Sequence, residues 1–76
     1  MSGYIAYRVC DRIYGSIQDF DSLIKAEEYL EDCIEDDAEN LMQYGISTDK
    51  GYIDNVSYEL ARKKAESFYF IETVED

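Results

Sequence analysis

Apolar residues recur at helical spacing through more than a quarter of this chain, and that pattern limits the folds open to it. At 100° per residue, one stripe between positions 23 and 44 collects Leu23, Ala26, Leu30, Cys33, Ile34, Leu41 and Tyr44. Phe20 precedes the stripe as a hydrophobic staple, Asp21 or Ser22 can act as its N-cap, and Gly45 follows as a C-cap. The pattern predicts one long amphipathic helix, whose apolar stripe must pack against another layer.

Residues with high β-propensity flank this helix on both sides and can supply that layer. Residues 4–10 alternate apolar side chains as a strand does, residues 11–12 predict a turn, and residues 13–17 predict a returning strand. Gly15 inside the second segment marks a bulge or a close backbone approach. Residues 67–74 predict a C-terminal strand. An N-terminal hairpin and one further strand are therefore expected.

A second, shorter helix is expected between the long helix and the last strand. Residues 46–55 predict a loop with a small turn at 49–51, and Asn55 or Ser57 can cap a helix that ends near Glu66. Its buried side would carry Tyr58, Ala61, Ala65 and Phe68. The expected fold is a single α+β domain over residues 1–76, a three-stranded antiparallel sheet with helices packed on one face.

Asp37 breaks the apolar pattern, because it falls near the middle of the stripe, where an unpaired carboxylate is unfavourable. One interpretation ends the first helix at Asp36, whose spacing to Glu39 makes a capping box that opens a second short helix. The other lets the helix run on, with its C-terminal half projecting beyond the core so that Asp37 stays in water. The sequence favours the break.

Six of the ten side chains from position 31 to position 40 are carboxylic acids. Like charges three or four residues apart on a helix destabilise it, so this density has no visible benefit for folding. A row of carboxylates at one-turn spacing resembles the phosphate ladder of a nucleic acid. Tyr29 beside the acids suits a protein interface. The candidate partner-binding residues are Glu28, Tyr29, Glu31, Asp32, Glu35, Asp36, Asp37 and Glu39.

The charge of the whole chain indicates the chemistry of a partner. Eighteen acids against seven bases give a net charge of −11, which repels nucleic acids and anionic membranes and attracts basic proteins. Residues 62–64 form the one basic cluster, and their spacing to Glu59 and Glu66 predicts an ordinary ion-paired helix face. A basic, nucleic-acid-binding protein is the expected partner, and direct contact with nucleic acid is not expected.

Catalytic, cofactor and metal sites are not expected. The chain has no histidine, the usual general base, and no glycine-rich phosphate loop. The acids of residues 48–55 do not match the spacing of a calcium loop. Cys10 and Cys33 fit neither a zinc pair nor a redox motif; a disulfide could form in an oxidising compartment, and thiols are expected in a cytoplasmic protein, the favoured location. The start of the sequence has no basic and apolar stretch typical of an export signal.

In length, charge and the run "EEYLEDCIEDDAEN", this chain resembles the small acidic inhibitors encoded by phages and mobile elements, including anti-restriction and anti-CRISPR proteins. The resemblance implies a non-enzymatic inhibitor that occupies the basic nucleic-acid groove of a nuclease or defence complex in a bacterial host. Two other functions stay open. An acidic immunity or antitoxin-like protein would plug a basic toxin, and an accessory domain would carry a merely solvated acidic face.

Overall fold

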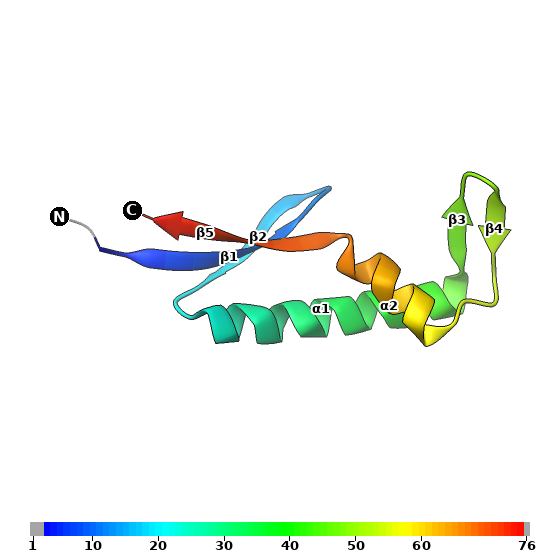
Figure 1. Ribbon diagram of the computed structural model, residues 1–76, viewed down its shortest axis with the longest axis horizontal. Helices are drawn as coiled ribbons and strands as arrows, with labels where there is room; N and C mark the ends of the chain where they lie inside the picture. The colour runs from blue at the N-terminus through cyan, green and yellow to red at the C-terminus, as the bar shows by residue number, and fades with distance from the viewer. Residues whose placement is uncertain (1–2, 76) are drawn as a thin grey trace.

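The computed structural model describes residues 3–75 and contains a three-stranded antiparallel sheet with both helices on the same side of it (Figure 1). The sheet is formed by β1 (Ile5–Asp11), β2 (Gly15–Phe20) and β5 (Tyr69–Glu75), in the order β2-β1-β5. The N-terminal hairpin and the C-terminal strand of the predicted fold are thereby confirmed. β1, the central strand, carries Val9, which is fully buried.

The hairpin between β1 and β2 differs from the prediction in its turn. The turn takes up residues 12–14, whose backbone is held by Asp11: its carboxylate accepts hydrogen bonds from the N–H groups of Ile13 (2.7 Å) and Tyr14 (3.1 Å). The irregularity in pairing lies opposite the Val9/Cys10 step and not at Gly15, which begins β2. The predicted returning strand therefore started two residues too early, because an aspartate-stabilised turn outweighed the β-propensity of its apolar residues.

The long helix α1 (Leu23–Tyr44) runs without interruption, so the favoured break at Asp36 was wrong. α1 lies along the sheet and continues past it, where α2 (Tyr58–Glu66) packs across its C-terminal half (Figure 1). The close approach follows from Ala61 and Ala65, both fully buried on α2. With Ile34, Ala38, Ile46 and Val56 they form the main apolar cluster, against which Leu30, Leu41 and Tyr69 pack. Tyr58, which the sequence placed on this buried side, is 43% exposed.

The segment predicted as a loop contains a short hairpin instead. β3 (Ile46–Thr48) and β4 (Gly51–Ile53) pair as a separate two-stranded sheet around the predicted turn. Gly45, the predicted C-cap of α1, has φ of 86°, and its N–H donates to the carbonyl of Leu41 (2.8 Å). This hairpin projects from the end of α1 that is far from the sheet (Figure 1).

Candidate functional site

The eight acids of α1 point in three directions, because α1 packs against other elements on two sides. Toward the sheet, Tyr29 packs its ring against Phe20 of β2, with 5.2 Å between ring centroids. Asp37 points the same way and accepts a hydrogen bond from the hydroxyl of Tyr69 on β5. Both residues were candidate partner contacts, and both are half-buried in contacts within the molecule.

The bond from Tyr69 explains how a carboxylate fits into the apolar stripe of an unbroken helix. Burial, together with the hydrogen bond to Asp37, raises the pKa of the Tyr69 hydroxyl, so it stays protonated and remains a donor. Because the half-buried carboxylate of Asp37 accepts a hydrogen bond, it avoids most of the desolvation penalty that an unpaired carboxylate would carry. Burial likewise raises the pKa of the Tyr29 hydroxyl.

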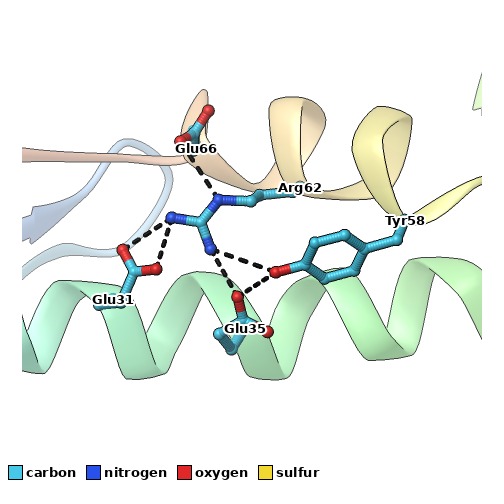
Figure 2. A network of polar contacts seen from close by, with 5 residues as sticks. All are labelled: Glu31, Glu35, Tyr58, Arg62 and Glu66. Carbon is cyan, nitrogen blue, oxygen red and sulfur yellow. Dashed lines mark hydrogen bonds and ion pairs between the residues drawn. The ribbon is translucent and has the colours of Figure 1, made fainter.

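Toward α2, two of the candidate acids are bound by one arginine. Figure 2 shows the guanidinium of Arg62 reaching across from α2 to α1. Its Nη2 lies 2.5 Å from Oε1 of Glu31, and its Nη1 lies 2.6 Å from Oε1 of Glu35. The Tyr58 hydroxyl also donates to Glu35, and Nε of Arg62 lies 3.6 Å from Glu66 on its own helix. Arg62 therefore holds three carboxylates at once.

These contacts shift the titration of the groups involved. The hydrogen bonds from Arg62 lower the pKa of Glu31, and those to Glu31 and Tyr58 raise the pKa of Arg62. The hydrogen bond to Glu35 raises the pKa of the Tyr58 hydroxyl, because ionised tyrosine would face a carboxylate. The network joins the two helices and neutralises part of the charge that the sequence assigned to a partner.

The remaining five acids of α1 are exposed, and Glu27 among them lies apart from the other four. Glu28, Asp32, Asp36 and Glu39, called the outward row below, fall within about 80° of one another at 100° per residue. All four are exposed, and none forms an ion pair with a cation among residues 3–75. The one basic residue of α1, Lys25, pairs with Asp21 at 3.2 Å. The outward row is therefore a continuous strip of uncompensated negative charge.

A shallow hollow lies beside the N-terminal end of the outward row. Its lining comes entirely from α1: Ile24, Glu27, Glu28, Glu31 and Asp32. Four of these five side chains are carboxylates, and one is already held by Arg62. The hollow can accept a basic side chain that reaches the helix surface.

The sequence did not predict that Arg62 binds α1. The predicted pair with Glu66 exists, but it is the longest of the three ion pairs that Arg62 makes. A signal was present: the small side chains of Ala61 and Ala65 suit close packing of α2, and Glu31 and Glu35 lie one turn apart on the acidic side of the long helix. A cation beside a close helix contact is well placed to reach such a pair.

Within residues 3–75, no group of three or more acidic or thiol side chains converges as metal ligands would. Cys10 and Cys33 are both free, and burial raises the pKa of each thiol above its ordinary value. Neither α1 nor α2 has the length together with the apolar character that a membrane crossing requires.

Comparison of the chain with protein-family models, with curated proteins and with solved structures finds no match.

Proposed function

We propose that the protein is a non-enzymatic inhibitor that binds the basic nucleic-acid-binding surface of a nuclease or defence complex. The outward row takes the place of backbone phosphates in that surface. The observation that carries the proposal is the division of charge on α1: Arg62 neutralises the acids facing α2, whereas the outward row has no cation within the described chain.

The spacing of the outward row supports phosphate mimicry. Glu28, Asp32 and Asp36 follow one another at four-residue steps, about 6 Å of helix rise each. Every second phosphate along a DNA strand recurs at an axial rise of about 6.8 Å. Glu39 extends the row to a rise of about 16 Å from Glu28. Glu28, Asp32 and Asp36 therefore rise at nearly the interval of alternate phosphates, whereas the step from Asp36 to Glu39, about 4.5 Å, is shorter.

The way α1 is held favours tight binding. α1 packs against the sheet through Tyr29 and Asp37 and against α2 through the Arg62 network, so the outward row is fixed before a partner arrives. Repulsion among its carboxylates is then already present in the free protein, and a basic surface relieves it on binding. Association should be fast and should weaken as salt rises.

The location of the tyrosines favours mimicry over the plugging of a toxin active site. A plug would concentrate its binding energy in one or two residues, and an exposed tyrosine beside an acid would be a suitable anchor. Tyr29, the tyrosine nearest the outward row in sequence, packs against Phe20. The tyrosines that are most exposed, Tyr14 and Tyr44, belong to the hairpin turn and the far end of α1.

The test is capture of partners from bacterial lysate by wild type and by a variant with the outward row neutralised: Glu28→Gln, Asp32→Asn, Asp36→Asn and Glu39→Gln. We expect wild type to retain a basic nucleic-acid-binding protein at about 0.05 M salt, and the variant to lose it. The same protein should elute at about 0.5 M salt, and duplex DNA should compete with the inhibitor for it.

A matched control removes the same number of charges from exposed positions elsewhere: Asp49→Asn, Asp54→Asn, Glu59→Gln and Glu75→Gln. Under the proposal, this control captures the same partner as wild type. Equal losses in both variants would mean that net charge alone matters. Equal capture by all three proteins would make the outward row a solvated surface, and a captured partner that DNA does not displace would favour plugging.

A further inference from the structure

A groove lies between the turn of the β1–β2 hairpin, the C-terminal half of α1 and the connection from α2 to β5. Its volume of about 440 Å³ is within the range of binding pockets. At 100° per residue, the side of α1 that packs on the sheet through Tyr29 and Asp37 continues to Leu41 and Tyr44. Because α1 continues past the sheet (Figure 1), this part of its apolar stripe borders the groove.

The lining of the groove is mainly apolar and aromatic. The turn, α1 and the α2–β5 connection each contribute two such side chains, which are Ile13, Tyr14, Leu41, Tyr44, Phe68 and Tyr69. Ile13, Tyr14 and Tyr44 remain 75%, 86% and 65% exposed. Single exposed apolar residues are common, but a group of them around one hollow marks a surface that binds another molecule.

Two carboxylates make the groove negative. Oδ2 of Asp37 accepts from the Tyr69 hydroxyl, and Oδ1 of Asp11 accepts from two N–H groups of the turn. The other oxygen of each carboxylate accepts no hydrogen bond from residues 3–75. Asn40 and Gly45 complete the lining, so no base within the described chain lines the groove. Burial and the bond to Asp37 raise the pKa of the Tyr69 hydroxyl, and the charge of Asp11 raises it further, so both acids act on the same part of the groove.

Tyrosine rings beside uncompensated carboxylates suit an arginine side chain, because a guanidinium stacks on aromatic rings and donates to carboxylates. The molecule contains this combination elsewhere: Nη1 of Arg62 lies between Glu35 and the Tyr58 hydroxyl, 3.5 Å from the latter (Figure 2). The three arginines of the chain, Arg8, Arg12 and Arg62, are each held by groups outside the groove. An arginine in the groove must therefore come from another molecule.

The open form of the groove favours an arginine that belongs to a protein. A small-molecule site buries about 70–90% of its ligand, whereas Tyr14 and Tyr44 leave much of this groove in water. A protein can cover such a rim with the residues on either side of its arginine, and the apolar lining favours apolar residues there. The net charge of −11 attracts basic proteins in general.

We propose that this groove binds an arginine side chain that a partner protein presents between apolar residues. The guanidinium stacks on an exposed tyrosine ring and donates to the free oxygens of Asp11 and Asp37. The groove receives a side chain, whereas a plug inserts one. It lies about 130° around α1 from the outward row, so the two surfaces are separate and the proposal does not depend on the proposed function.

The test is a titration of the protein with the tripeptide acetyl-Leu-Arg-Leu-amide, followed by amide chemical shifts. With peptide up to about 10 mM in about 0.05 M salt, saturable shifts are expected in residues 11–14, 40–45 and 68–69. The same peptide with citrulline, which has the shape of arginine without its charge, should bind about tenfold more weakly. Acetyl-arginine amide should also bind about tenfold more weakly, because it cannot cover the apolar rim.

Two double variants test the lining. Asp11→Asn with Asp37→Asn removes both charges but keeps an oxygen for the turn and for Tyr69, and should weaken binding about tenfold. Its matched control, Asp49→Asn with Asp54→Asn, removes the same charge from exposed positions at the β3–β4 hairpin and should bind as wild type. Tyr14→Ser with Tyr44→Ser should also weaken binding, and circular dichroism should show that each variant is folded.

Several results would overturn the proposal. They are a titration without saturable shifts, equal binding of the citrulline peptide, and equal losses in the groove variant and its control, which would make net charge the cause. Equal binding of acetyl-arginine amide would make the occupant a small cation. The protein with the outward row neutralised should bind the peptide as wild type, and a loss there would place the peptide on the row. Since that variant and the groove variants change different surfaces, the two proposals can fail separately.

Discussion

Neutralising the outward row should make the isolated protein more stable while removing its binding activity. Within the row, Glu28 and Asp32 are four residues apart, as are Asp32 and Asp36, and Asp36 and Glu39 are three apart. Like charges at these spacings each destabilise a helix by about 0.2–0.5 kcal/mol. Replacing the four carboxylates by amides should therefore raise the free energy of unfolding by about 0.6–1.5 kcal/mol.

This gain in the free energy of unfolding is measurable for a domain of this size. A change of that order corresponds to a rise in Tm of about 2–12 °C for a chain of fewer than 100 residues. Circular dichroism at 222 nm, recorded during thermal denaturation in about 0.01 M salt, will show it. At about 1 M salt the Debye length falls to about 3 Å, below the spacing of the row, and the difference in Tm should largely disappear.

The control variant with four dispersed neutralisations should gain less stability at low salt, because its acids are not neighbours on one helix. A neutralised row with an unchanged or lower Tm at low salt would refute the reasoning: the carboxylates would then not repel one another, and no strain would be available for a partner to relieve. A gain in Tm that persists in high salt would assign the effect to helix propensity.

Three further perturbations test contacts inside the molecule. Arg62→Gln should lower Tm at neutral pH. Because the pKa of Glu31 is depressed in the folded state, the difference in Tm from wild type should be full above about pH 5 and should shrink as pH falls through that pKa, as thermal denaturation will show. Tyr69→Phe removes the donor to Asp37, and urea denaturation should show a loss of about 1–2 kcal/mol, limited by partial exposure of the carboxylate; no loss would mean that water replaces the hydroxyl. Gly45→Ala should lower Tm, because a positive φ disfavours alanine and its Cβ would collide with β4, whereas Gly15→Ala, with open space around the added Cβ, should lower it less.

Most of the fold could be predicted from local signals. The apolar stripe of α1, the cap at Ser57 and the β-rich termini each depend on neighbouring residues, and the elements they predict are present. The Ser57 hydroxyl accepts from the N–H of Leu60 at 3.2 Å, as an N-cap should. The short β3–β4 hairpin was missed because three-residue strands are too brief to show alternation.

The uninterrupted course of α1 could not be predicted, because its cause is distant in sequence. Asp37 looked unfavourable in an apolar stripe until Tyr69, 32 residues further along, supplied a donor. The division of the acids into a neutralised pair and an outward row has the same origin. Arg62 lies 31 residues from Glu31, and only the packing of α2 shows which carboxylates it reaches.

Because the molecule is elongated, ligands bound at its distant surfaces should have little influence on one another. The structure measures 53 Å along its longest axis and only 14 Å along its shortest. At physiological ionic strength a charge is screened beyond about 8 Å, so a basic surface docked on the outward row exerts almost no field at the β3–β4 hairpin or at the far end of the sheet. The core is also thin, since Val9 is the one large side chain that is fully buried within the described residues. Distant surfaces of this protein should therefore acquire or lose ligands as separate, additive events, with no coupling free energy between them.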